Sequence, residues 1–247
     1  FVGHGSPMNA LADNEFTRAI ARMRDLCLSP KAVLCVSAHW TTKGTRISRS
    51  RNPRTIHDFY GFPAELFAMN YPAPGDPELA AEMANAISGL TTDDSWGIDH
   101  GAWSVLCHMF PKAEVPVLQL SLDLDQPPAY HFQFAQALRS WRERGVLILG
   151  SGNIVHNLGL LERRSDASPY PWAEAFDLQV KEKLVARQFT ELLDFTSTPE
   201  AKLSVPTPEH YLPMLYVLGA ADPEDELHFS FEGSEHGSIS LRSFVLG

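Results

Sequence analysis

The apolar positions along the chain fall into two patterns, one typical of buried strands and one typical of amphipathic helices. Residues 32–37, 115–120 and 146–150 are short and almost continuously apolar, which predicts buried strands. Residues 1–3 resemble the end of a further strand, and residues 227–231 and 238–245 are expected to form strands near the C-terminus. Strands that are apolar on both faces indicate a sheet covered by helices on both sides.

Between these segments, apolar residues recur every three or four positions. In residues 15–26 the spacing of Phe16, Ile20 and Met23 is close to the helical period of about 3.6 residues. Similar patterns predict helices over residues 77–90, 101–110, 129–144, 172–193 and 211–220. The alternation of strands and helices favours the α/β class. We therefore expect residues 1–247 to form one domain, with a central, mostly parallel or mixed sheet flanked by helices on both faces.

Composition narrows the range of partners. The chain has 30 acidic and 20 basic residues, a formal net charge of −10, which argues against nucleic acids and anionic membranes as partners. No apolar run approaches the ~18 residues that span a bilayer, and no signal peptide is visible. Cys27, Cys35 and Cys107 form no CxxC motif, which argues against a disulfide framework. We expect a cytoplasmic protein that is a monomer or a small homo-oligomer.

Histidines occupy the ends of several predicted elements. His39 follows the strand at 32–37, His4 follows the strand end at 1–3, and His156 lies in a glycine-rich turn after the strand at 146–150. The carboxyl ends of parallel strands meet at one edge of a sheet, and imidazole is the commonest metal ligand in proteins. Any single histidine is more often a structural residue, but three such placements together favour a metal site.

The remaining histidines have weaker signals. His100 precedes a predicted helix and His210 lies at the start of another, where both could join the site. His57 is interpreted either as a substrate-facing loop residue or as a structural one, with about equal weight. The others are taken as structural or surface residues, namely His108, His131, His228 and His236.

Aromatic residues close to these histidines could stack on a flat ring, although each one alone is more often a core residue. They are Trp40, Phe59, Tyr60, Trp96 and Trp103. Other catalytic chemistry is weakly signalled, because the chain has neither a GxSxG nor a GxxxxGK[ST] motif.

Seven motifs, in order along nearly the whole chain, resemble the 4,5-DOPA extradiol dioxygenase family, within the class III, LigB-type ring-cleavage dioxygenases. They are Gly3-His4-Gly5-Ser6-Pro7-Met8, Ser37-Ala38-His39-Trp40, Thr55-Ile56-His57-Asp58-Phe59, Tyr71-Pro72-Ala73-Pro74-Gly75, Asp99-His100-Gly101-Ala102-Trp103, Gly152-Asn153-Ile154-Val155-His156-Asn157-Leu158 and Pro208-Glu209-His210-Tyr211-Leu212-Pro213.

The resemblance implies a LigB-like α/β fold and an enzyme that opens the ring of a small catechol with O₂. It implies that His4 and His39 bind one divalent metal, and that His210 takes a third metal-side position where the wider class uses a glutamate. His156 matches either a further ligand or the catalytic acid–base, and His100 a second catalytic histidine. His57 and Trp40 are expected to contact substrate. Fe(II) would serve dioxygenase activity, and Zn(II) is expected in purified protein because divalent affinities favour it.

Two other functions remain open from the residues alone. A zinc-dependent hydrolase or amidase could use His4, His39 and His210 to activate water, and it would be indifferent to O₂. A protein that only binds partners is disfavoured, because the candidate histidines are all retained.

Overall fold

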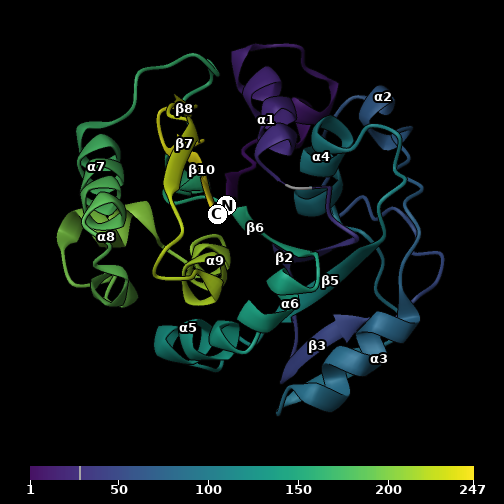
Figure 1. Cartoon of the computed structure of the whole chain (residues 1–247). Helices are drawn as coiled ribbons and strands as arrows, with labels where there is room; N and C mark the ends of the chain where they lie inside the picture. Colours follow the sequence, from purple (N-terminus) through teal and green to yellow (C-terminus); the bar gives the residue numbers. More distant parts are fainter. Residues whose placement is uncertain (28) are drawn as a thin grey trace.

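The central element is β2 (Ala32–Thr41), in a computed structural model that describes residues 1–27 and 29–247 (Figure 1). It lies in a six-stranded sheet of order β1-β6-β2-β5-β3-β4, in which only the β3–β5 pairing is antiparallel. The other strands of this sheet are β1 (Val2–Gly3), β3 (Thr45–Ser48), β4 (Leu90–Asp93), β5 (Val117–Leu122) and β6 (Val146–Gly152).

Two small antiparallel pairs complete the described strands. One joins β7 (Leu227–Phe231) to β10 (Ser243–Leu246), and the other is a hairpin of β8 (Ser234–Glu235) and β9 (Ile239–Ser240). The α-helices are α1 (Glu15–Leu26), α2 (Ala64–Phe67), α3 (Pro77–Ala86), α4 (His100–Met109), α5 (Pro128–Gln136), α6 (Arg139–Glu143), α7 (Pro171–Val185), α8 (Pro199–Ser204) and α9 (Leu212–Ala220). Short 3₁₀ helices are η1 (Pro7–Leu11), η2 (Leu158–Leu160) and η3 (Phe189–Leu193).

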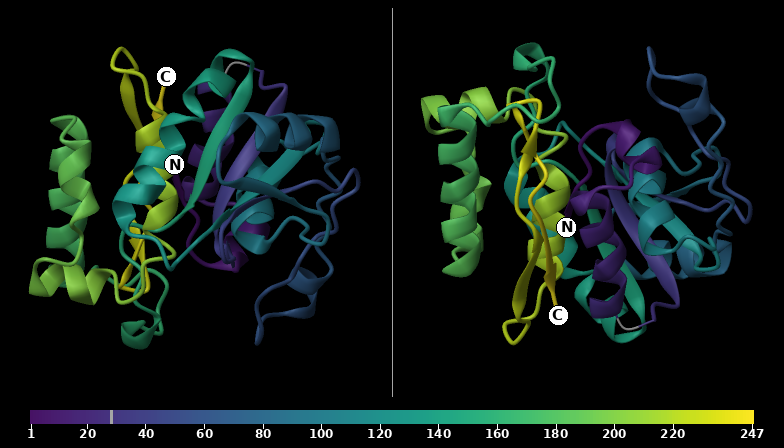
Figure 2. Two further views of the ribbon diagram at one scale, coloured as in Figure 1. Left: turned by 90° about the horizontal axis from the view of Figure 1, so that it is seen from below. Right: turned by 90° about the horizontal axis from the view of Figure 1, so that it is seen from above.

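Side chains of β2 alternate between two hydrophobic cores. Leu34 and Val36 pack in the core formed with α5, α7 and α9, whereas Val33 and Cys35 pack in the core formed with α1 and α4. The helices accordingly lie on opposite sides of the sheet (Figure 2). The predicted α/β class, with a mixed sheet covered on both faces, is therefore confirmed.

Local sequence signals explain the elements that were predicted best. Asn14 and Thr17 form a reciprocal capping box at the start of α1, and the apolar stripe of Phe16, Ile20 and Met23 is buried. The predicted bounds 15–26 and 227–231 match α1 and β7. The predicted helices at 101–110 and 211–220 and the strands at 115–120 and 146–150 are present with shifted ends.

Other predicted bounds are wrong. The helix expected over 77–90 ends at Ala86, because the backbone of Ile87 is already extended, and Leu90 begins β4. The helix expected over 129–144 divides into α5 and α6 where Ala137 and Leu138 make tighter i→i+3 hydrogen bonds.

The helix expected over 172–193 ends at Val185, and Arg187, with φ at +56°, turns the chain toward η3. The strand expected over 238–245 is interrupted between β9 and β10. The strand expected over 32–37 continues to Thr41, so His39 lies within β2 and not after it.

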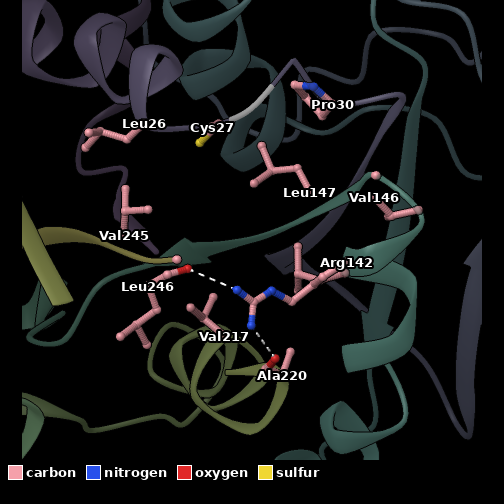
Figure 3. Close-up of a pocket in the computed structure, with 13 residues that line it drawn as sticks. Leu26, Cys27, Pro30, Arg142, Val146, Leu147, Val217, Ala220, Val245 and Leu246 are labelled. Carbon is pink, nitrogen blue, oxygen red and sulfur yellow. Dashed lines mark hydrogen bonds between the residues drawn. The ribbon is translucent and has the colours of Figure 1, made fainter. Parts of the chain in front are cut away.

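The two ends of the sheet differ in character. A pocket of about 230 Å³ lies beside the start of β6, where Val146 and Leu147 meet Arg142 (Figure 3). The Arg142 guanidinium donates to the carbonyl of Ala220 at 2.8 Å and to that of Leu246 at 3.4 Å. No histidine lines this pocket in the described part of the chain.

Within residues 1–27 and 29–247, no helix has the length and apolar character needed to cross a membrane.

Candidate active site

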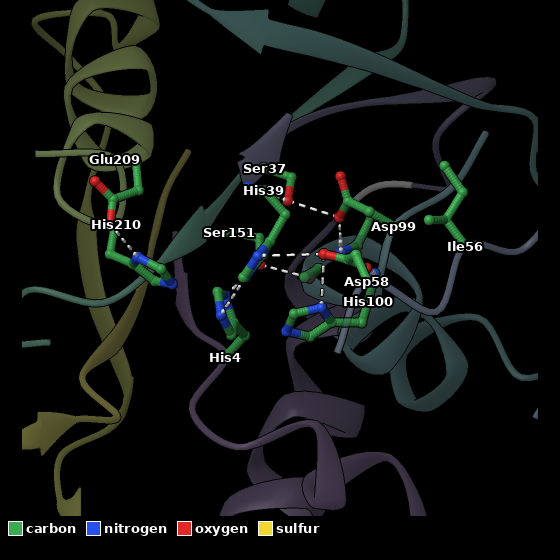
Figure 4. A network of polar contacts seen from close by, with 12 residues as sticks. His4, Ser37, His39, Ile56, Asp58, Asp99, His100, Ser151, Glu209 and His210 are labelled. Carbon is green, nitrogen blue, oxygen red and sulfur yellow. Dashed lines mark hydrogen bonds and ion pairs between the residues drawn. The ribbon is translucent and has the colours of Figure 1, made fainter. Parts of the chain in front are cut away.

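Five histidines that are far apart in the sequence converge near the carboxyl ends of β1, β2 and β6. His4 follows β1, His39 lies near the end of β2, and His156 follows β6. His100 is the first residue of α4, and His210 lies two residues before α9. Figure 4 shows His4, His39, His100 and His210 turned toward a common region. The ring centroid of His4 is 5.2 Å from that of His39 and 5.4 Å from that of His210. The structure thus brings together the residues that the strand-end argument selected.

The tautomer of His4 follows from its hydrogen bonds. The Ser151 hydroxyl has one proton, which it donates to the carbonyl oxygen of Gly101 at 2.5 Å. Its oxygen therefore accepts from Nδ1 of His4, which lies 3.0 Å away. With the proton on Nδ1, the lone pair of His4 is on Nε2.

His39 is oriented in the same way by a carboxylate. Nδ1 of His39 lies 3.3 Å from Oδ2 of Asp58, and Nδ1 of His100 lies 2.9 Å from the same oxygen. The other carboxylate oxygen accepts from the backbone N–H of His100 at 2.9 Å. Despite its partial burial, which opposes ionisation, the contacts with His100 and His39 lower the pKa of Asp58. An ionised Asp58 at this distance favours the tautomer of His39 that carries its proton on Nδ1, which leaves its Nε2 free.

A second carboxylate orients His210. Nδ1 of His210 lies 3.2 Å from Oε1 of Glu209, and the hydroxyl of Thr207 donates to the same oxygen at 2.7 Å. Glu209 therefore orients the ring of His210 through its Nδ1, as carboxylates do for many metal-binding imidazoles.

The nitrogens that remain face one another. Nε2 of His4 lies 3.3 Å from Nε2 of His39, and His4, His39 and His210 offer ligand atoms that all lie within 4.8 Å of one another. If both nitrogens carry lone pairs, their contact is repulsive unless a cation lies between them. Two nitrogens bound to one ion at about 2.1 Å and at roughly 90–110° are about 3.0–3.4 Å apart. The donor set therefore fits a single divalent metal.

Burial keeps these imidazoles neutral. Desolvation, reinforced by the neighbouring histidines, lowers the pKa of His4 and of His210 well below 6.5. Desolvation and the nearby His100 lower the pKa of His39 to about 3. Neutral imidazole is the form that binds metals, so the site is ready for a cation near neutral pH.

His156 lies next to His210, at one side of the cluster formed by His4, His39 and His210. Its ring stacks on that of His210, with centroids 3.4 Å apart and planes at 10°, and it shares a possible ligand group with Glu209 and His210. Burial lowers its pKa to about 4, with the charge of Glu209 acting in the opposite direction. His100 lies on the other side, with its ring centroid 3.9 Å from that of His39.

A buried polar network fixes the start of α4, which carries His100. Asp99 caps this helix by accepting from the N–H of Ala102 at 3.1 Å. The same carboxylate accepts from the Ser37 hydroxyl and from the side-chain amide of Gln119, each at 2.7 Å. A Cβ on Gly101 would lie 2.6 Å from Oγ of Ser37, so this position needs a glycine for the helix to approach β2 so closely.

Phe59 is the candidate aromatic residue that lies against the histidines, since its ring meets that of His100 edge-on at 5.4 Å. His57 packs behind it, at 5.8 Å from Phe59 and 5.6 Å from Trp103, and its Nε2 donates to the carbonyl of Met69. Trp103 is fully buried and donates to the carbonyl of Ile56.

Trp40 is placed elsewhere. It is buried and stacks on Trp96 with the two ring planes 3° apart, not on the histidines. Tyr60 is 91% exposed. The structure therefore brings Phe59 to the site but leaves Trp40, Trp96 and Tyr60 outside the histidine cluster.

The orienting residues were missed by sequence reasoning. Asp58, Asp99 and Glu209 lie in the motifs given above but had no predicted role, and Ser151 lies just before one of these motifs and was not singled out. A serine in a glycine-rich strand end and an aspartate next to a histidine are weak signals, because the histidines that they contact are not their neighbours in the sequence: Asp58 contacts His39 and His100, and Ser151 contacts His4, 147 positions away.

Comparison with known proteins agrees with this site. The family model described as the catalytic LigB subunit of aromatic ring-opening dioxygenase matches residues 4–241. The chain belongs to the LigB family. It is 44% identical to an Escherichia coli (strain K12) protein named 4,5-DOPA dioxygenase extradiol, over 100% of this chain and 93% of that protein. A Beta vulgaris protein of the same name is 36% identical, over 98% of this chain and 96% of that protein.

Structural comparison supports the same assignment. A crystal structure of an E. coli K12 protein described as uncharacterized matches with a TM-score of 0.85 and 40% identity, over 99% of this chain and 97% of that one. The LigB-like fold predicted from the sequence is thus confirmed. The LigB family comprises aromatic ring-opening dioxygenases, and the predicted enzyme class is confirmed as well.

Proposed function

We propose that this LigB-family enzyme opens the ring of a small catechol, such as DOPA, beside the diol and incorporates both atoms of O₂. The substrate class is supported by the names of the relatives in E. coli and Beta vulgaris. The observation that carries the proposal is the approach of the Nε2 atoms of His4 and His39 to 3.3 Å, with each Nδ1 turned to an acceptor.

We propose that His4, His39 and His210 hold one Fe(II) ion. When bound, Fe(II) supplies open coordination positions for a catecholate and O₂ and a path for electrons between them. Zn(II) would fit the same nitrogens, but it is redox-inert and would give an inactive enzyme for this reaction. His156 could serve as a further ligand, because ligand atoms of His156, Glu209 and His210 also lie within 4.8 Å of one another.

Two histidines flank the proposed ligands and are suited to move protons. Because burial lowers its pKa to about 4, His156 is neutral at pH 7 and has a free lone pair, and it would take the proton of a catechol hydroxyl once the bound metal has made that hydroxyl more acidic. Its position against His210 keeps it next to the proposed metal. His100, with Nδ1 at 2.9 Å from Asp58, would assist from the other side.

Phe59 is proposed as one wall for the substrate ring, because it lies directly against His100. His57, predicted to contact substrate, would act by supporting Phe59 from behind. Trp40 would contribute through the packing of the β2 end against Trp96 and not by direct contact.

The test is oxygen uptake by protein freshly loaded with Fe(II), using DOPA, caffeate and dihydroxyphenylacetate. We expect one O₂ consumed per catechol and a yellow ring-opened product. His39→Ala should abolish uptake, whereas His228→Ala, which changes an exposed histidine of β7 outside the histidine cluster, should not. Absence of uptake across the panel would refute the proposal. Cleavage of an ester or amide substrate at equal rates with and without O₂ would favour the hydrolase instead.

A further inference from the structure

Glu235 is a buried carboxylate in the β8–β9 hairpin, with 7% of its surface exposed. No lysine, arginine or histidine forms an ion pair with it among residues 1–27 and 29–247. Instead, Oε1 accepts from the backbone N–H of Ser6, and Oε2 lies 3.4 Å from the side-chain nitrogen of Asn9. A buried charge is costly unless hydrogen bonds compensate it, so its placement here calls for a reason.

The carboxylate is linked to His4 through Asn9. The side-chain nitrogen of Asn9 also donates to the carbonyl of His4 at 3.2 Å, and the N–H of His4 donates to the carbonyl of Gly152 at 3.0 Å. Both backbone polar groups of His4 are therefore held, one by β6 and the other by the pair of Asn9 and Glu235.

The turn after His4 is shaped around the same carboxylate. Gly5 has φ at +62°, and a Cβ there would collide with Oε1 of Glu235 and with Leu241. The hairpin therefore packs directly on the turn that determines where the His4 ring points.

The other side of the hairpin holds the segment of His156. The N–H of Ser240 donates to the carbonyl of Val155 at 3.0 Å, and the N–H of Asn157 donates to the carbonyl of Ser238 at 3.1 Å. His156 itself forms a bridge with Ile239. One short hairpin thus connects two histidines of the site that come from distant parts of the chain.

We infer that Glu235 is a positioning residue, which fixes the backbone of His4 so that its Nε2 meets that of His39. The inference rests on the proposed function, in which His4 is a metal ligand. It predicts that both oxygens must be acceptors, because Ser6 and Asn9 each present a donor. Glu235→Gln can satisfy only one of them without turning the Asn9 amide away from His4.

The experiment compares Zn(II) affinity, measured by competition with a chromophoric chelator well below the melting temperature. We expect Glu235→Gln to raise the dissociation constant about tenfold, the size typical of losing an outer partner of a ligand. The control is Glu232→Gln, which removes a half-exposed carboxylate of the neighbouring segment that pairs with Arg242 and should leave affinity unchanged. Circular dichroism of the metal-free proteins establishes that each variant is folded.

Asn9→Ala provides a second variant in case Glu235→Gln does not fold. It should weaken Zn(II) to a similar extent, and the double variant should lose little more, because both residues act through one chain of hydrogen bonds. Folded Glu235→Gln or Asn9→Ala protein with wild-type affinity would overturn the inference alone. Wild-type protein that binds no metal would overturn the proposed function and this inference with it.

Discussion

Replacing Asp58 with Asn exchanges one acceptor oxygen for a donor at a point shared by His39 and His100. In the native protein, Oδ1 accepts from the N–H of His100 and Oδ2 faces Nδ1 of both histidines, at 3.3 Å and 2.9 Å. If the amide oxygen keeps the bond to the backbone, the amide NH₂ faces Nδ1 of His39. His39 must then accept on Nδ1 and carry its proton on Nε2, where it blocks a metal.

The opposite amide orientation is no better. It would turn the NH₂ group toward the N–H of His100 and leave a buried donor without an acceptor, which costs about 1–3 kcal/mol. Loss of an outer carboxylate typically weakens metal binding about 10- to 100-fold, or about 1.4–2.7 kcal/mol. We therefore expect Asp58→Asn to weaken Fe(II) binding within this range.

Anaerobic isothermal titration with Fe(II) measures this effect. The matched control is Asp94→Asn, which removes an exposed carboxylate that pairs with Arg49 and should bind iron as the wild type does. If Asp58→Asn also binds iron with wild-type affinity, the assignment of the Nδ1 proton by Asp58 is wrong.

Two further outcomes follow from other buried groups. Ser151→Ala removes the acceptor of the His4 Nδ1 proton, so we expect about tenfold weaker metal binding in the same titration, and unchanged affinity would show that the hydroxyl does not set the tautomer. Burial lowers the pKa of His131 from 6.5 to about 4, so below pH 6.5 the unfolded chain takes up a proton that the folded protein does not. This residue should therefore lower the free energy of unfolding by about 3 kcal/mol between pH 6.5 and 4. His131→Asn, which keeps a polar group near the Tyr216 hydroxyl, should remove that part of the pH dependence in urea titrations, and identical pH profiles would contradict the cause given.

The fold was predictable where one local signal dominates. The capping box of Asn14 and Thr17 and the apolar stripe of α1 determine that helix from neighbouring residues alone. By contrast, β3 and β4 were missed, because each has four residues and only part of each is buried. The pairing of β3 with β4 on one side and with β5 on the other arises from contacts that no local pattern encodes.

The candidate site divides in the same way. The meeting of His4, His39 and His156 at one edge was predictable, because it follows from the direction of parallel strands. The tautomers were not, because they depend on Ser151 and Asp58, whose side chains reach the histidines only in the folded chain. Which aromatic candidate lies near the histidines was likewise not predictable, because only the packing of the folded chain distinguishes Phe59 from Trp40, Trp96 and Tyr60.

The central claim is that His4, His39 and His210 share one cation through their Nε2 atoms. A crystal structure of protein loaded anaerobically with Fe(II), with anomalous diffraction recorded at the iron edge, tests it most directly. The account predicts an iron peak bonded to these three nitrogens, with Asp58 and Glu209 still on the Nδ1 side of their histidines. An iron bound by either carboxylate, or no peak between His4 and His39, would contradict it.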